Sequence, residues 1–209
     1  MCGNARVEVT ARHRLSVQQY LALERKAVVK SEFVNGEIFA MAGGTRRHSR
    51  IKVKITSALE QRLSSSSCQV FDSDMRLKVE VTDFYTYPDA QVACGKLRFE
   101  DECEDVLLNP KVIIEVLSDS SAAWDRGEKF WHYRHLLSLA EYVLVSQSAW
   151  LVEHYTRQKD GTWVLETVEG SAGVLHLRSI RCKIPLKEIY QSTGLAAVKS
   201  PSRKSATHS

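Results

Sequence analysis

The chain has 209 residues, of which 44% are hydrophobic and 26% are charged, with a net charge of +4. These values are ordinary for one folded domain with a sizeable core. They exclude a helical membrane protein, because no apolar run approaches the roughly 18–20 residues that cross a bilayer. The positive charge permits a nucleic-acid partner but does not require one.

The five cysteines are odd in number, scattered, and never form a Cys-x-x-Cys pair. This pattern argues against a disulfide framework and against a thiolate zinc site. The N-terminus has no apolar signal core. We therefore expect a cytoplasmic protein in a reducing compartment.

Residues 1–14 read as a flexible arm. Ser16 and Gln19 have the spacing of a helix capping box, which predicts a short helix over residues 17–26. Residues 32–41 are predicted to form a β-hairpin, because Asn35 and Gly36 supply the two positive φ angles of a type I′ turn.

Residues 46–63 are predicted to form a helix with one apolar stripe at i, i+4 spacing. Its other faces are rich in lysine and arginine, which suits phosphate groups. The candidate nucleic-acid contacts are Arg46, Arg47, His48 and Arg50. A lone histidine is more often structural, and any single charge on a helix is more often only solvated.

Two apolar segments each carry one acidic residue. Residues 112–117 read as a strand buried on both faces, interrupted by Glu115. Asp89 follows Pro88 and opens another apolar strand. An ionised carboxylate inside a core needs a compensating cation or several donors, so these two side chains are candidates for sharing one divalent ion.

The remaining elements were predicted from periodicity and turn residues. We expect strands over 68–71 and 75–81, a loop over 95–109 whose acidic run 100–105 is solvated, and a helix over 122–137. Further strands are expected over 141–146, 150–157, 162–168, 174–177 and 184–190, with Asp160-Gly161 as a second hairpin turn. Residues 196–209 are expected to be disordered, which leaves a single domain over 15–195. The alternation predicts a mixed α/β sheet flanked by helices.

The order of these residues resembles the restriction-endonuclease-like superfamily, whose signature is Pro-Asp, a spacer, and (Asp/Glu)-x-Lys. The chain carries Pro88-Asp89 and Glu115-Val116-Leu117 at the matching places, and the order of elements over 46–146 is similar to the α-β-β-β-α-β core of that fold. The further set Glu32, His48, Asp125-x-x-x-Lys129-x-x-x-Tyr133 and Glu141-Tyr-x-Leu-Val resembles a large bacterial family of proposed endonucleases within it. The likeness covers residues 15–190.

One position departs from the superfamily signature. The signature lysine belongs two residues after the glutamate, where this chain has Leu117. The resembling family places its lysine on the following helix, which makes Lys129 the candidate. Asp125, Lys129 and Tyr133 lie on one helical stripe.

The resemblance implies a Mg²⁺-dependent (or Mn²⁺-dependent) DNA endonuclease. Asp89, Glu115 and the carbonyl of Val116 would hold the ion, Lys129 would assist the attacking water, and Glu32 would add a carboxylate from the hairpin. Each residue also has a structural interpretation: Asp89 as a turn residue, Glu115 in a buried salt bridge, Lys129 paired with Asp125, and Glu32 on a surface strand.

Cutting both strands of a duplex favours a homodimer, for which the apolar segment 150–155 is a candidate edge. Two other functions stay open. One is a catalytically inactive nucleic-acid-binding or interaction module, which Leu117 motivates and which a solvent-facing Lys129 would favour. The other is an enzyme acting on a small phosphorylated or acidic substrate, which a closed pocket would favour.

Overall fold

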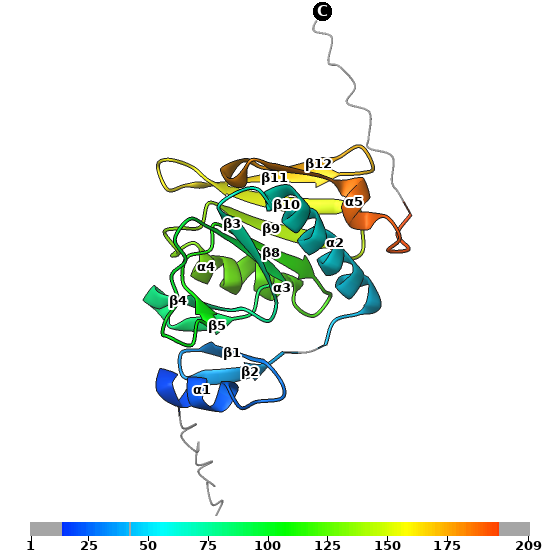
Figure 1. Cartoon of the computed structure of the whole chain (residues 1–209). Coiled ribbons are helices and arrows are strands. Elements are labelled where there is room, and N and C mark those ends of the chain that lie inside the picture. Colours follow the sequence, from blue (N-terminus) through cyan, green and yellow to red (C-terminus); the bar gives the residue numbers. More distant parts are fainter. Residues whose placement is uncertain (1–13, 42, 197–209) are drawn as a thin grey trace, which may run out of the picture.

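Two mixed β-sheets form the centre of the computed structural model, which describes residues 14–41 and 43–196 (Figure 1). The larger sheet has six strands in the order β11 (Trp163–Glu169), β10 (Leu151–Arg157), β9 (Glu141–Ser146), β8 (Val112–Leu117), β6 (Ala90–Cys94) and β3 (Cys68–Asp72). Only β8 and β9 run parallel; the other neighbours are antiparallel. Helix α2 (Arg46–Leu63) precedes β3, and a helical segment connects β8 to β9, so the expected core order is confirmed.

The smaller sheet has five strands in the order β2 (Glu37–Ala40), β1 (Ser31–Val34), β5 (Phe84–Thr86), β4 (Arg76–Val79) and β7 (Val106–Leu107). The β1–β2 turn is the predicted one, with φ of 50° at Asn35 and 86° at Gly36. Helix α1 (Val17–Glu24) begins at the predicted capping box of Ser16 and Gln19 and packs against this sheet.

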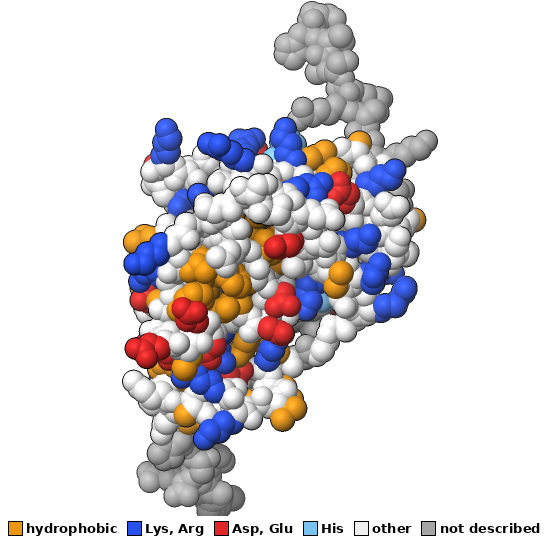
Figure 2. All heavy atoms as spheres, in the orientation of Figure 1, with side chains coloured by type: hydrophobic (Ala, Val, Ile, Leu, Met, Phe, Trp, Pro, Cys, Tyr) orange, Lys and Arg blue, Asp and Glu red, His pale blue; other side chains and the backbone are white. Residues whose placement is uncertain are grey.

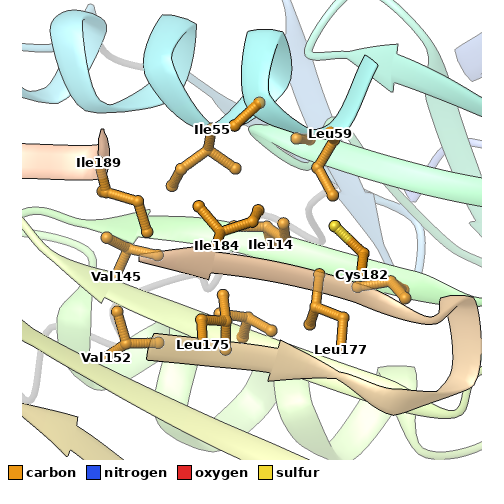
Figure 3. Packing of buried hydrophobic residues seen from close by; sticks show 14 of the residues in the cluster. Ile55, Leu59, Ile114, Val145, Val152, Leu175, Leu177, Cys182, Ile184 and Ile189 are labelled. Carbon is orange, nitrogen blue, oxygen red and sulfur yellow. The ribbon is translucent and has the colours of Figure 1, made fainter. Parts of the chain in front are cut away.

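The main core lies between α2 and the six-stranded sheet. Ile51, Ile55, Leu59 and Leu63 form the buried stripe of α2. Figure 3 shows Ile55 and Leu59 above Ile114 of β8, beside residues of the β12 (Val174–Leu177) and β13 (Cys182–Pro185) hairpin. A short helix, α5 (Leu186–Tyr190), replaces the last part of the strand that was expected over 184–190. This packing fixes α2, and therefore the residues at its start, relative to β8.

The segment predicted as one helix over 122–137 is shorter and interrupted. It consists of α3 (Ala122–Trp124), a π-helical turn over Asp125–Lys129, and α4 (Phe130–Tyr133). A π turn has i→i+5 hydrogen bonds, which no simple residue periodicity predicts. Because of this turn, Asp125, Lys129 and Tyr133 are all buried against the sheet.

Two further details differ from expectation. The segment predicted as a loop over 95–109 contains β7, which pairs with β4. The acidic run 100–105 is not simply solvated, because Arg25 forms ion pairs with Asp101 and Asp105, and Lys78 pairs with Glu100. Long-range partners of this kind leave no local sequence signal.

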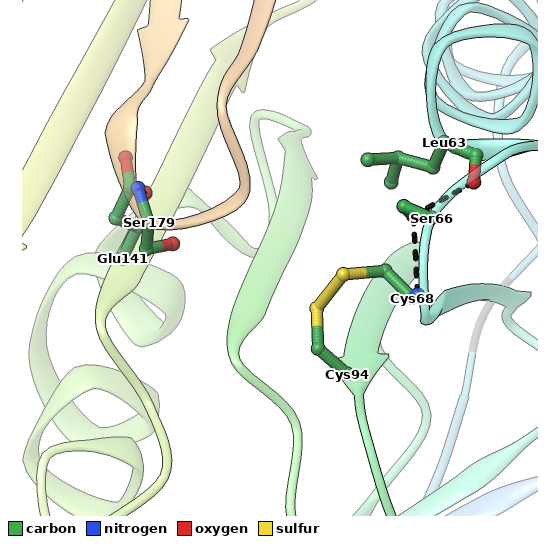
Figure 4. Close-up of a disulfide and its surroundings, with 6 residues drawn as sticks. All are labelled: Leu63, Ser66, Cys68, Cys94, Glu141 and Ser179. Carbon is green, nitrogen blue, oxygen red and sulfur yellow. Dashed lines mark hydrogen bonds between the residues drawn. A yellow bond between two sulfur atoms is a disulfide. The ribbon is translucent and has the colours of Figure 1, made fainter.

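The expectation of unpaired cysteines is wrong for two of the five. Cys68 and Cys94 are register partners on β3 and β6, with Cα atoms 3.9 Å apart, and they form a disulfide (Figure 4). The side chain of Ser66 stabilises the approach to β3 by hydrogen bonds to Leu63 and Cys68. Cys103 and Cys182 are free.

The expected dimer edge is also wrong, because β10 lies inside the sheet between β9 and β11. The free edge on that side is β11, where Val164 and Leu165 are exposed. Within 14–41 and 43–196, no helix has the length and apolar character needed to cross a membrane. The arm over 1–14 and the tail over 196–209 lie almost wholly outside the described residues.

Candidate active site

Asp89 and Glu115 lie side by side where β6 begins and β8 ends. The backbone N–H of Val116 donates to Oδ2 of Asp89 at 2.8 Å, and the backbone nitrogen of Asp89 lies 3.4 Å from Oε2 of Glu115. The Asp89 side chain is 13% exposed and Glu115 is 5% exposed. The pairing of β6 with β8 therefore brings together two carboxylates that are 26 residues apart in the chain.

Lys129 is buried among three carboxylates and does not face solvent. Its Nζ lies 3.0 Å from Glu32, 3.1 Å from Glu115 and 3.2 Å from Asp125. It also donates a hydrogen bond to Oε1 of Glu115. The nearest oxygen of Asp125 has no hydrogen-bond partner, so that contact is electrostatic. The helix stripe predicted from sequence thus faces the carboxylates.

Burial and charge act in opposite directions on this cluster. Burial raises the pKa of Glu115 to about 8, although Lys129 and the hydroxyl of Tyr133 both stabilise its anion. Burial alone would lower the pKa of Lys129, but Glu115, Glu32 and Asp125 raise it well above its ordinary value. Lys129 is therefore a cation at neutral pH.

Glu32 reaches this cluster from the other sheet. Its Oε1 accepts a hydrogen bond of 2.6 Å from Thr86, and its Oε2 accepts one of 3.1 Å from the indole N–H of Trp124. The sequence analysis did not identify Thr86 or Trp124. An indole that meets a carboxylate across 92 residues has no local signature.

These side chains form the floor of a cleft of about 900 Å³. His48, near the start of α2, lies over Asp89 with Nε2 3.1 Å from Oδ2. Lys30 and Lys52 also line the cleft. Figure 2 shows that lysine and arginine side chains gather over α2, on the right of the view.

The predicted nucleic-acid contacts do not all lie together. Arg46 and Arg47 line a second hollow of about 350 Å³, which adjoins the cleft because Thr45, Asp119 and Gln147 line both. The Nε atom of Arg47 is buried without a hydrogen-bond partner. Arg50 is exposed and lines neither hollow. Of the four predicted contacts, His48 lines the cleft and Arg46 and Arg47 line the adjoining hollow. Arg50 lies outside both.

The donor set fits a small, hard cation. Oε1 of Glu115 is occupied by Lys129 and Tyr133, which leaves Oε2 on the side of Asp89. Mg²⁺ takes oxygen ligands, keeps several waters and needs few protein carboxylates. The described residues contain no cluster of three or more His, Cys, Asp and Glu side chains suited to a metal ion. An ion between Asp89 and Glu115 would therefore have two carboxylate ligands from these side chains.

A mixed sheet with helices on both faces, which holds two carboxylates on neighbouring strands and a buried lysine, has the arrangement of the restriction-endonuclease-like superfamily, and the fold of this chain is of that type. The class of protein that this fold and site indicate is a nuclease. The chain belongs to the Uma2 family, described as "Putative restriction endonuclease", whose model matches residues 17–185.

Relatives and a solved structure agree with this assignment. A Synechocystis sp. protein, sll1609, is 36% identical over 156 residues, covering 75% of this chain and 88% of its own length. A second Synechocystis protein, slr1290, is 33% identical over 183 residues, covering 88% and 94%. A crystal structure from Anabaena variabilis, described as "a putative nuclease belonging to DUF820", superposes with a TM-score of 0.70 at 18% identity, covering 84% of this chain and 97% of the other. At that identity the likeness concerns the fold.

Proposed function

We propose that the protein is a divalent-metal-dependent DNA endonuclease that hydrolyses phosphodiester bonds in the cleft. The observation that carries the proposal is the convergence of Asp89, Glu115 and Lys129 at its floor. Lys129 points into the carboxylates, which does not favour the inactive module. Loss of the motif lysine at position 117 is thereby compensated from the following helix.

Asp89, Glu115 and the carbonyl of Val116 would hold Mg²⁺ or Mn²⁺. The N–H of Val116 points to Asp89, and the N–H and C=O of one strand residue point the same way, which directs that carbonyl to the same side. When bound, the ion neutralises charge that builds on the phosphate and activates a water.

Lys129 carries its proton in this arrangement, because three carboxylates surround it. It therefore orients the attacking water and stabilises negative charge, and does not act as the base. Glu32 holds Lys129 from the opposite side and is itself fixed by Thr86 and Trp124. The phosphates that flank the scissile bond would be contacted by His48, Arg46 and Arg47. Arg50 would add to the positive electrostatic potential around α2.

A homodimer and a cytoplasmic location belong to the same proposal. Cutting both strands of a duplex favours two sites, and the edge strand β11, on which Val164 and Leu165 are exposed, is the candidate contact between two copies. Sedimentation velocity tests the dimer. The Cys68–Cys94 disulfide is unusual for a reducing compartment, so its redox state in cells tests the location.

The activity is tested by nicking of supercoiled plasmid with Mg²⁺ or Mn²⁺. Glu115→Gln and Lys129→Ala should each abolish it, while Lys54→Ala, which removes one cation from α2 outside the cleft, should leave it intact. Nicking that persists in Glu115→Gln would contradict the metal site. If only Glu115→Gln is inactive, the metal site stands and Lys129 has another role. Absence of nicking together with absence of metal binding by calorimetry would favour the inactive module.

A further inference from the structure

Phe39 is an exposed aromatic residue beside the buried carboxylates. It lies on β2 directly opposite Glu32 on β1, so the two side chains occupy the same face of the hairpin. Both line the cleft. Glu32 is 8% exposed, whereas the ring of Phe39 is 48% exposed. The hairpin therefore presents a flat apolar surface to solvent at the lip of the cleft, next to its most acidic part.

Two lysines line the same cleft as this ring. The backbone of Lys30 pairs with Met41, two positions along the hairpin from the pairing of Glu32 with Phe39. The Nζ atoms of Lys30 and Lys52 both contact Ser73, at 2.8 and 2.9 Å, and line the same cleft. The ammonium of Lys30 also pairs with the exposed carboxylate of Asp74. Cations and an exposed aromatic ring that line one cleft are the combination that single-strand-binding grooves use, with cations on the backbone and rings on the bases.

The size of the cleft limits what can reach its floor. A volume of about 900 Å³ lies at the upper end of the range for small-ligand pockets, roughly 300–1,000 Å³. That is room for a short stretch of one strand at the floor of the cleft. The carboxylates at the floor are 13% exposed or less, so a phosphate must enter the cleft to meet them.

We propose that Phe39 stacks against a nucleobase next to the scissile phosphate, and that the cleft accepts unpaired nucleotides. The substrate class is then a single strand, or a nucleotide displaced from a duplex, with Lys30 and Lys52 on a neighbouring phosphate. This inference rests on the proposed function, because that function places the scissile phosphate between Asp89 and Glu115. It assigns substrate-binding roles to three residues that sequence analysis did not single out.

The test is binding of a fluorescein-labelled oligonucleotide, followed by anisotropy without metal, in the full chain carrying Glu115→Gln. Stacking of one base contributes about 1–3 kcal/mol, so Phe39→Ala should weaken single-strand binding about tenfold. Phe39→Trp should restore it, whereas Phe39→Leu, which keeps apolar area without a ring, should resemble Phe39→Ala. The matched control is Leu23→Ala on α1, because Leu23 is 54% exposed and lies outside the cleft.

The lysine contacts have their own readout. Each phosphate contact adds about 0.7 to the slope of log affinity against log salt for a single strand. Lys52→Ala should reduce that slope by about this amount, and Lys54→Ala, with the same charge change on the same helix, should leave it unchanged.

Three results would overturn the inference: single-strand binding by Phe39→Ala within twofold of the parent, an equal loss in Leu23→Ala, or an equal loss for a blunt duplex of the same sequence. Failure of the proposed function is distinguishable, since it appears as absent nicking by the otherwise unmodified chain with metal.

Discussion

The hydroxyl of Tyr133 donates a hydrogen bond of 2.8 Å to Oε1 of Glu115, the same oxygen that accepts from Lys129. Two donors thus fix one oxygen and leave Oε2 on the side of Asp89. Tyr133 acts on the proposed metal site through Glu115, so it is a positioning residue.

Replacing Tyr133 by Phe removes this donor and keeps the packing. The bond lowers the pKa of Glu115, so its loss should raise that pKa further and weaken metal binding about tenfold at neutral pH. Calorimetric titration with Mn²⁺ measures the change, and raising the pH should recover affinity. Tyr142→Phe is the matched control, because the Tyr142 hydroxyl is buried but donates to the carbonyl of Asp125. An equal loss in that variant would contradict the positioning role.

The raised pKa of Glu115 predicts a pH-dependent stability. The folded protein binds a proton here up to about pH 8, whereas the unfolded chain releases it near 4.5. The stabilising contribution of this one group should therefore be complete below about pH 4.5 and should be lost as pH rises through about 8. Glu115→Gln should flatten that fall and unfold at a temperature a few degrees higher than wild type at pH 9. Thermal unfolding at pH 5, 7 and 9 tests this, and a lower midpoint at pH 9 would contradict it.

Metal binding at this site should release a proton. The ion requires the ionised form of Glu115, so affinity should increase as pH rises toward about 8. Calorimetry in two buffers of different ionisation enthalpy counts the protons released. A buffer-independent enthalpy near pH 7 would mean that Glu115 is already ionised or does not bind the ion.

Lys129 is the only cation in contact with three buried or nearly buried carboxylates within the described chain. Lys129→Met should therefore destabilise the protein by about 3–5 kcal/mol, because it leaves buried charge without compensation. Adding Glu115→Gln should recover part of the loss. Urea unfolding of both single variants and the double variant measures the coupling, and additive effects would show that the two side chains act independently.

The Cys68–Cys94 disulfide closes a loop between residues separated by 26 positions. Replacing both cysteines by serine should cost about 3 kcal/mol through the larger entropy of the unfolded chain. Urea unfolding with and without reductant measures this. A free-thiol assay on the native protein is the control, and reactive thiols at both positions would contradict the pairing.

Much of the fold was predictable because its signals are local. The capping box at Ser16, the turn at Asn35-Gly36 and the apolar stripe of α2 each fix an element from a few neighbouring residues. Asp89 and Glu115 were predicted as site residues for the same reason. An ionised carboxylate in an apolar strand is costly to bury unless a cation or several hydrogen-bond donors stabilise it.

What the sequence could not supply depends on long-range pairing. Trp124 contacts Glu32, and Arg25 contacts Asp101 and Asp105, only because separate elements meet in three dimensions. The disulfide was missed because cysteine spacing says nothing about strand register. The π turn was missed because the apolar pattern of residues 122–137 is equally compatible with an uninterrupted helix.

The π-helical turn over Asp125–Lys129 affects how many residues can separate the lysine from the strand that carries Glu115. A π turn takes up one residue more than an α turn, so it can be regarded as an insertion absorbed within a helix. Gly127, in its middle, has open space around its Cβ position, and its carbonyl accepts a hydrogen bond from the backbone N–H of Phe130. Deletion of Gly127 should restore a continuous α-helix and rotate Asp125 away from Lys129 while the lysine stays over Glu115. A π turn thus allows the spacing along the chain between the proposed catalytic lysine and its carboxylate to change by one residue, and motifs with fixed spacing would overlook such a site.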